Sequence, residues 1–357
     1  MHSHEYYAGL DVHKLSISVC IKKADGSIVG EEKLAATRGA LRAWAERAPR
    51  PLVAGLEATL FSHWIYSALV PLVDGVVMGH PARMRAISCG KKKNDRLDAA
   101  TLADLLRADL FPAITVLPEA YVELRRTLRY RQLLVREMVR MKNKIASLLM
   151  ECGVEYSRGS LHGKNYFQHL LKENADIAAA LKPLLRFSRK QVEELQRMER
   201  TLVDQLAQKP EVAERLARLT TIRGVGTMTA LTWVLEVGPV ERLPSIRQAV
   251  SYCGLCSAQR SSAGVDKRGP LSKQRNHFLQ TAMIEAAKLA PRWNPLLADV
   301  HEKESRRGHR NRATLAVARK LVAYLWAADR GHQPIARPEP SEAFLSHDRA
   351  IHPMMAA

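Results

Sequence analysis

Long apolar runs, a secretory leader and a cysteine framework are all missing from this sequence. No stretch approaches about 18 uninterrupted apolar residues, so we expect no membrane-spanning helix. The opening MHSHEYYAGLDVHK has no basic segment followed by a long apolar run, which argues against a secretory signal. The cysteines are odd in number and scattered: Cys20, Cys89, Cys152, Cys253 and Cys256. This pattern favours reduced thiols in a cytoplasmic compartment.

Acidic residues are also few relative to basic ones. The 357 residues hold 36 Asp and Glu against 55 Lys and Arg, a formal net charge of +19 at pH 7. Such a surplus suggests a polyanionic partner, because each neutralised phosphate releases condensed counterions. A protein with solvated basic faces would show the same surplus, so charge alone leaves nucleic acid as one of two interpretations.

The first third of the chain has a mixed α/β pattern. Short alternating or apolar runs predict strands, and apolar spacing of three and four predicts helices, with Asn94 as an N-cap. An Asp-Gly turn at 25–26 joins the first two strands. We expect strands at residues 6–23, 27–30, 51–56 and 75–78, and helices at residues 38–48, 60–70 and 94–110.

The sequence predicts that the rest of the chain is mainly helical. Residues 119–152 contain no Gly or Pro and predict one long, basic, amphipathic helix, and residues 187–207 predict a second. Two long helices around a shorter segment favour a helical hairpin or coiled-coil spacer. Shorter helices are expected at 227–236, 245–253, 271–290 and 311–329. We therefore predict an α/β domain at 1–117, a helical coiled-coil spacer or dimerisation region at 118–218, a mainly α domain at 219–330 and a mobile tail at 331–357.

Four carboxylates stand at informative places in the first domain. Asp11 lies inside an apolar strand, and Glu57 directly follows a buried run. Asp95 and Asp98 are three apart and so share one face of the expected helix. Clustered carboxylates repel unless a cation neutralises them, and hard oxygen ligands favour Mg²⁺ or Mn²⁺. Two such ions ~4 Å apart can support in-line phosphoryl transfer. For Asp95 and Asp98 alone, a solvated helix N-terminus is the alternative.

The segments around these carboxylates resemble the three motifs of the DEDD insertion-sequence transposases. The segments are residues 9–14 (GLDVHK), 55–59 (GLEAT) and 93–99 (KNDRLDA). Later segments resemble the C-terminal transposase domain of that family, in the same order and up to about residue 330. They are residues 221–226 (TIRGVG), 252–255 (YCGL), 260–264 (RSSAG), 269–273 (GPLSK) and 316–320 (AVARK).

The resemblance implies a RuvC-like N-terminal domain with an RNase H fold, a coiled-coil spacer and a mainly α, serine-bearing C-terminal domain. The family's acidic metal ligands correspond to Asp11, Glu57, Asp95 and Asp98. Its serine attacks DNA and forms a transient phosphoserine link. The family's spacing of eleven residues before Lys273 corresponds to Ser262, with Ser261 as the near alternative.

The resemblance also implies the partners. Members are guided by a structured bridge RNA that pairs with double-stranded donor and target DNA. They act as a dimer of dimers in which the acidic site and the serine come from different subunits. On this basis we expect a prokaryotic, cytoplasmic recombinase, associated with the nucleoid when active.

A serine hydroxyl needs a base, a metal or charge stabilisation to act as a nucleophile. No Gly-x-Ser-x-Gly elbow surrounds Ser262. The charge of a phosphoryl-transfer transition state could instead be stabilised by the cations near it in the sequence, Arg260, Lys267, Arg268, Lys273 and Arg275. A Ser-, Gly- and Lys-rich linker would have the same composition as the stretch around Ser262. Gly224 and Gly226, before the helix at 227, resemble a phosphate-cradling turn, although a simple helix-opening turn has the same pattern. The expected nucleic-acid contacts are Lys91, Lys92, Lys93, Gly224, Gly226, Arg260, Lys267, Arg268, Lys273 and Arg275.

Two other functions remain open at this point. A RuvC-like junction nuclease would use the carboxylates and an activated water without serine chemistry. A non-catalytic nucleic-acid-binding protein would need only the basic faces and the long helices. Covalent capture of DNA separates the first alternative from a transposase, and loss of function on replacing Asp11 separates the second.

Overall fold

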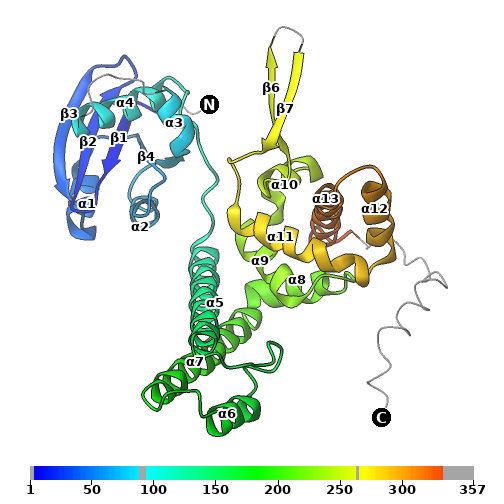
Figure 1. Cartoon of the computed structure of the whole chain (residues 1–357). Coiled ribbons are helices and arrows are strands. Elements are labelled where there is room, and N and C mark those ends of the chain that lie inside the picture. The colour runs from blue at the N-terminus through cyan, green and yellow to red at the C-terminus, as the bar shows by residue number, and fades with distance from the viewer. Residues whose placement is uncertain (1–3, 88–93, 263–264, 333–357) are drawn as a thin grey trace. The chain divides into compact units, whose positions relative to one another are not determined.

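The computed structural model describes residues 4–87, 94–262 and 265–332 of the chain. It divides into two compact units, Met1–Glu119 and Ala120–Ala357 (Figure 1). The finer division into four parts stays a prediction. Within the described residues, no helix combines the length and the apolar character that crossing a membrane requires.

The first unit is built on a five-stranded sheet of order β3-β2-β1-β4-β5. Strand β2 pairs antiparallel with both β1 and β3, whereas β4 pairs parallel with β1 and β5 pairs parallel with β4. The predicted single strand over 6–23 is wrong: the chain reverses at residues 13–15, where the His13 amide donates to the Ser16 carbonyl. The strands are β1 (Tyr6–Val12), β2 (Ser16–Lys23), β3 (Ile28–Ala35), β4 (Leu52–Glu57) and β5 (Gly75–Gly79).

Helices lie on both faces of this sheet. Because side chains alternate along a strand, Ala8, Leu10 and Val12 share one face of β1 and pack with Leu41, Trp44 and Ile65 of α1 and α2. Helix α4 packs on the opposite face, against β1, β2 and β4 (Figure 1). The helices are α1 (Arg38–Arg47), α2 (Ser62–Leu69), α3 (Pro81–Ile87) and α4 (Asp95–Arg107).

Helix α4 approaches β1 so closely that position 9 accepts only glycine. A Cβ atom on Gly9 would stand 2.0 Å from the Ala99 carbonyl oxygen and 2.5 Å from the Ala103 amide nitrogen. Both are backbone atoms, so no side-chain rotation relieves the overlap. Gly9 therefore fixes the depth at which α4 lies on the sheet.

Gly9→Ala is expected to destabilise the protein by about 1–3 kcal/mol, because α4 must move away from β1. The same movement should weaken divalent-metal binding, since α4 begins with Asp95. Thermal unfolding and a Mn²⁺ titration measure the two effects. Gly30→Ala in β3 is the matched control, because a Cβ there has no neighbour within 4 Å. Equal behaviour of the two variants would contradict the packing argument.

The second unit is helical. Its core gathers residues of α8, α9, α11 and α13 around Trp233, which is fully buried. Helix α5 begins at Glu119, the last residue of the first unit. The helices are α5 (Glu119–Glu151), α6 (Lys164–Glu173), α7 (Leu181–Ala207), α8 (Pro210–Thr220), α9 (Thr227–Val237), α10 (Ile246–Tyr252), α11 (His277–Leu289), α12 (Pro295–Arg306) and α13 (Arg310–Asp329), with short 3-10 turns η1 (Val240–Arg242) and η2 (Ala290–Arg292).

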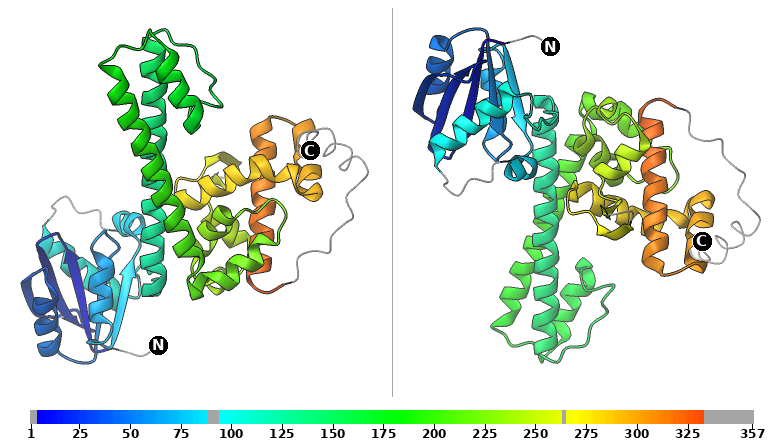
Figure 2. Two further views of the ribbon diagram at one scale, coloured as in Figure 1. Left: turned by 90° about the horizontal axis from the view of Figure 1, so that it is seen from below. Right: turned by 90° about the horizontal axis from the view of Figure 1, so that it is seen from above.

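Two long helices, α5 and α7, lie side by side (Figure 2). The C-terminal end of α5 and the N-terminal end of α7 form a separate small core with α6, in which Ile145, Phe167 and Leu185 are buried. Arg131 of α5 and Glu199 of α7 form an ion pair. Both helices were predicted from the sequence, with α7 starting at 181 instead of 187. That they act as a coiled-coil spacer stays a prediction.

A buried ionic network joins distant parts of the second unit. The Asp329 carboxylate at the end of α13 accepts hydrogen bonds from Arg215 at 2.8 and 2.5 Å and from the Trp233 indole at 2.8 Å. The Asp329 side chain is fully buried and that of Arg215 is 13% exposed. Because an unpaired buried charge is costly, these contacts fix α8, α9 and α13 to one another.

A β-hairpin stands where the sequence predicted loops and the start of a helix. Strands β6 (Ser257–Ser262) and β7 (Val265–Leu271) pair antiparallel, with Ser257 opposite Leu271 and Ser262 opposite Val265. The helix predicted at 271–290 is wrong at its start, because β7 extends to Leu271. Helix α11 begins only at His277, after Asn276 caps it by accepting from the Leu279 amide at 3.1 Å.

Candidate active site

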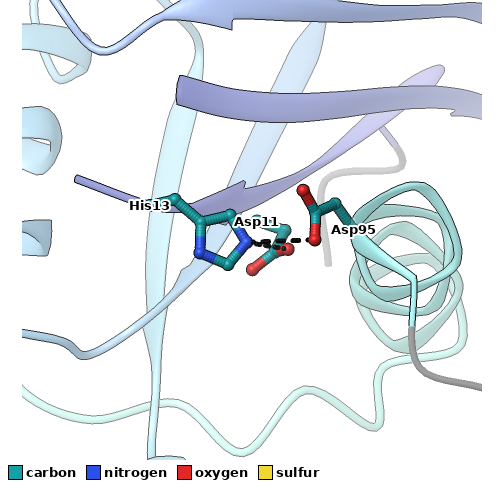
Figure 3. A group of neighbouring side chains, drawn as sticks. All are labelled: Asp11, His13 and Asp95. Carbon is teal, nitrogen blue, oxygen red and sulfur yellow. Dashed lines mark hydrogen bonds and ion pairs between the residues drawn. The ribbon is translucent and has the colours of Figure 1, made fainter. Parts of the chain in front are cut away.

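Three side chains of the first unit converge at one edge of the sheet. The His13 Nε2 lies 3.0 Å from Asp11 Oδ2 and 3.3 Å from Asp95 Oδ1. Figure 3 shows the imidazole facing both carboxylates, one from β1 and the other from the start of α4. One potential ligand atom from each residue lies within 4.8 Å of the others. The group is therefore close enough for a single cation to contact all three.

Local sequence rules explain why these groups meet. Asp11 alternates with Leu10 and so lies on the same face of β1 as Gly9, the face that α4 covers. The start of α4 is fixed by Asn94, whose side-chain oxygen accepts from the Arg96 amide at 3.1 Å. The predicted N-cap is thus confirmed. Asp95, the first residue of the helix, is placed beside the end of β1.

The charges of the site oppose one another. Burial raises the pKa of the Asp11 carboxyl, and the negative charges of Asp98 and Asp95 raise it further, while His13 acts in the opposite direction. The pKa of Asp95 is lowered, chiefly by the hydrogen bond from Lys33, whose Nζ lies 3.2 Å from Oδ2. A neighbouring cation would therefore stabilise the charged form of Asp11.

Glu57 and Asp98 lie near this group but outside the set of three. Glu57 ends β4, one residue after Leu56, which pairs with Leu10 of β1. Its carbonyl accepts from the Ser62 hydroxyl at 2.5 Å, which holds the end of the strand. Asp98 is half-buried on the first turn of α4 and close enough to Asp11 to affect its pKa. The roles of Asp11, Glu57, Asp95 and Asp98 as metal ligands stay predictions.

His13 is the member of the group that the sequence argument missed. The signal was the Asp-x-His spacing at the end of β1, because His13 directly follows the last strand residue and alternation along β1 would place it on the face of Asp11. The donor set of two carboxylate oxygens and one imidazole nitrogen fits a divalent cation, and carboxylate oxygens suit Mg²⁺ and Mn²⁺. The residues present are therefore compatible with a metal at this position.

The β6–β7 hairpin carries the predicted serine. The backbone of Arg260, Ser261 and Ser262 lies in β6, and that of Lys267 and Arg268 in β7. Their side chains, like residues 263–264, lie outside the described residues. The choice between Ser261 and Ser262 therefore stays a prediction.

The base of the hairpin is held firmly by the helices around it. Carbonyl oxygens entering β6 accept from side chains of two helices: Gly254 from Gln280 of α11 at 2.7 Å, and Leu255 from Arg319 of α13 at 2.8 Å. At the exit, the Ser272 amide donates to the Cys256 carbonyl at 3.0 Å. Both ends of the hairpin are thus fixed to the core of the second unit.

The hairpin base also connects to helix α5 through a buried carboxylate. Glu236 accepts two hydrogen bonds from Arg129 of α5, both at 2.8 Å, and one from the Asn276 side chain at 2.8 Å. The backbone N–H of Asn276 also donates to the Tyr252 carbonyl at 3.1 Å. Because the Glu236 side chain is fully buried, these bonds are shielded from water and hold α11 against α9.

The other predicted nucleic-acid contacts are spread over the chain. Lys91, Lys92 and Lys93 lie outside the described residues. Lys273 and Arg275 are exposed just after the hairpin. Their roles in binding stay predictions.

The two glycines before α9 have different surroundings. Gly224 has φ 88°, and a Cβ there would lie 2.8 Å from the Ala290 Cβ, so both the turn and its packing require glycine. Gly226 caps α9, with open space around the position of a Cβ. The roles of both glycines in binding nucleic acid stay predictions.

The two cysteines of the Cys253-x-x-Cys256 pair differ in burial: Cys253 is buried and Cys256 is half-buried. Cys253 is fully buried, and burial raises the pKa of its thiol to about 12. Burial therefore disfavours the thiolate, which is the nucleophilic form of a cysteine. Its place in the core with Leu255 and Trp233 explains its burial.

Comparisons with known proteins extend this picture. Residues 8–153 match the family model of DEDD transposases of IS110 elements, described as "Transposase". Residues 216–302 match the model "Transposase IS116/IS110/IS902 family". Fold and matches together define a DNA-processing enzyme whose DEDD domain implies an RNase H-like fold and a divalent metal. On these matches the chain is an insertion-sequence transposase that is similar, in both of its units, to the IS116/IS110/IS902 family.

Several curated relatives carry related names. A putative transposase y4qE of Sinorhizobium fredii is 24% identical over 91% of this chain and 89% of its own length. The transposase for insertion sequence element IS1328 of Yersinia enterocolitica is 24% identical over 89% of this chain and 95% of its own. The transposase for IS1111A of Coxiella burnetii is 28% identical over 66% of each chain.

Proposed function

We propose that this transposase cuts and rejoins DNA strands of an insertion sequence by using metal-binding carboxylates together with Ser262. The observation that carries the proposal is the convergence of Asp11, His13 and Asp95 at one point of the sheet. Burial and the neighbouring carboxylates disfavour the negative charge of Asp11, and a divalent cation would offset that cost and supply positive charge at a phosphate being transferred.

In this proposal Asp11, Glu57, Asp95 and Asp98 hold Mg²⁺ or Mn²⁺, with His13 beside them. A bound divalent ion supplies positive charge for the phosphate undergoing transfer. Lys33 holds Asp95 from the side opposite His13, because the two contact different oxygens of the carboxylate. Asn94 and Gly9 keep the helix that carries Asp95 and Asp98 at a fixed place on the sheet. These residues orient the ligands before any metal or DNA arrives.

Ser262 acts as the nucleophile in the second part of the site. Its hydroxyl oxygen forms a bond to the phosphorus of one phosphodiester, and the bond to the departing DNA hydroxyl breaks as that hydroxyl gains a proton. The hydroxyl of another strand then attacks the phosphoserine, and Ser262 regains its proton. One phosphoester replaces another in each step, so no oxidant or energy source is consumed. The firm base of the hairpin supports such a role, because a positioned nucleophile reacts faster.

A structured RNA and further copies of the chain complete the proposal. The resemblance of this chain to bridge-RNA-guided recombinases and its net charge of +19 support binding of RNA together with donor and target DNA. We expect a dimer of dimers in which the carboxylates of one subunit serve the serine of another.

The test combines the full chain, donor and target duplexes, and RNA transcribed from the non-coding DNA beside the gene. Joined donor–target strands should form with Mg²⁺ and RNA, together with a protein–DNA adduct that maps to the peptide containing Ser262. Chelation by EDTA should abolish both. Cut strands without any adduct would indicate a nuclease that uses water. Joining that is unaffected by EDTA would remove the metal from the proposal.

A further inference from the structure

A surface hollow of about 570 Å³ lies between α10, α12 and α13 of the second unit. Its volume falls in the range of sites for small organic ligands. Part of its wall is apolar, from Val250 of α10, Val300 of α12 and Ala316 of α13. The remaining wall is strongly basic, with Arg247, Arg312, Arg319 and Lys320.

The positive charge of the hollow is largely uncompensated. Glu304 is its one acidic lining residue, and Glu304 already pairs with Arg312 at 3.3 Å and with Arg307 at 3.7 Å. Among the residues that the structure describes, no carboxylate pairs with Arg247 or Lys320. Both are exposed, so their charges are available to an anion that enters the hollow.

The hollow borders the foot of the hairpin that carries Ser262. Cys256, the residue before β6, lines it. Arg319 lines it as well, while its Nε donates to the Leu255 carbonyl at 2.8 Å. From Ser257 to Ser262 the strand rises about 17 Å at 3.3 Å per residue. A polymer held in the hollow can therefore continue along the hairpin to Ser262.

We propose that this hollow binds an unpaired nucleotide of the DNA strand that leads to Ser262. Phosphates lie at Arg247 and Lys320, and the base lies against the apolar wall at Val250 and Ala316. A nucleotide matches both halves of the wall, because it joins an anion to a planar group with apolar faces. A strand is held beside the hairpin in this way without any reading of its sequence. The inference rests on the proposed function, since it gives the substrate path toward the serine.

The test measures binding of a fluorescent single-stranded oligothymidylate to the full chain by anisotropy. Arg247→Ala combined with Lys320→Ala should weaken binding about 30-fold, from two lost charge-assisted contacts. The slope of log K against log salt should fall by about 1.4, because each phosphate contact on a single strand contributes about 0.7.

The matched control is Lys303→Ala combined with Arg310→Ala. These two cations are exposed on α12 and α13 but do not line the hollow, and the change in net charge is the same. Equal weakening by both pairs would overturn the proposal, since it would reflect general charge. Loss of oligouridylate binding with oligothymidylate binding intact would also overturn it, because the occupant would then be RNA.

A second measurement needs no variant. Bound oligothymidylate should slow alkylation of Cys256 by iodoacetamide and leave Cys152 unchanged; both are free, half-buried thiols, and only Cys256 lines the hollow. An unchanged rate at Cys256 would overturn the proposal. Oligothymidylate binding in the hollow without any phosphoserine adduct would instead remove the proposed function and leave the binding site.

Discussion

Asp11→Asn is expected to lower Mg²⁺-dependent strand joining about 10³-fold, equivalent to about 4 kcal/mol of transition-state stabilisation. Asparagine keeps the size of the side chain and one oxygen but removes the negative charge. The pKa of Asp11 is raised by burial and by its acidic neighbours, so a bound cation would stabilise its ionised form. Rates measured with saturating RNA and a Mn²⁺ titration of the same protein report the two consequences.

The control for this variant is Asp25→Asn. Asp25 lies in the turn between β2 and β3, where it accepts hydrogen bonds from Ser27, and it does not belong to the cluster. We expect wild-type joining and metal binding from Asp25→Asn. If Asp11→Asn kept full joining activity, the carboxylates would have a structural role and the non-catalytic alternative would gain support.

Ser262→Ala is expected to lower strand joining by at least about 10⁴-fold, because the proposed nucleophile is removed. The protein–DNA adduct should vanish from denaturing gels. Metal binding should be unchanged, since the carboxylates lie in the other unit. Ser261→Ala is the matched control and should retain the adduct. The reverse result, with loss at Ser261 alone, would move the nucleophile by one position.

Mixing the two inactive proteins tests whether subunits share the site. If the carboxylates of one subunit serve the serine of another, Asp11→Asn and Ser262→Ala should restore part of the joining activity when combined. Each protein then supplies the half that the other lacks. No recovery across a range of mixing ratios would place both halves of the site in one subunit.

The parts of the site that follow from local rules could be predicted from the sequence. Strand alternation placed Asp11 on a strand, and the Asn94 cap fixed where the helix with Asp95 and Asp98 begins. The place of His13 in the site could not be predicted from such local rules. Its contact with Asp95 joins residues 82 positions apart, and only the packing of α4 on β1 brings them together.

The β6–β7 hairpin escaped prediction for a different reason. Its strands, SAQRSS and VDKRGPL, contain few apolar residues, so they lack the alternation that marks a half-buried strand. Backbone pairing and contacts at the base hold them instead, and the glycine and proline of β7 resemble loop signals. The single strand predicted over residues 6–23 was wrong for the opposite reason. There the alternation of apolar and polar residues continues through residues 13–15, where the chain turns.

The Asp329 network described for the second unit has a consequence for how the protein is made. Arg215 and Trp233 are synthesised 114 and 96 positions before the carboxylate that they bind. At about 5–20 residues per second, the ribosome needs about 6–23 s to travel from Arg215 to Asp329. Over that interval the guanidinium and the indole lack their acceptor. The serine-bearing unit therefore completes its core late in synthesis, and chains interrupted before Asp329 should be degraded instead of competing with finished subunits for DNA.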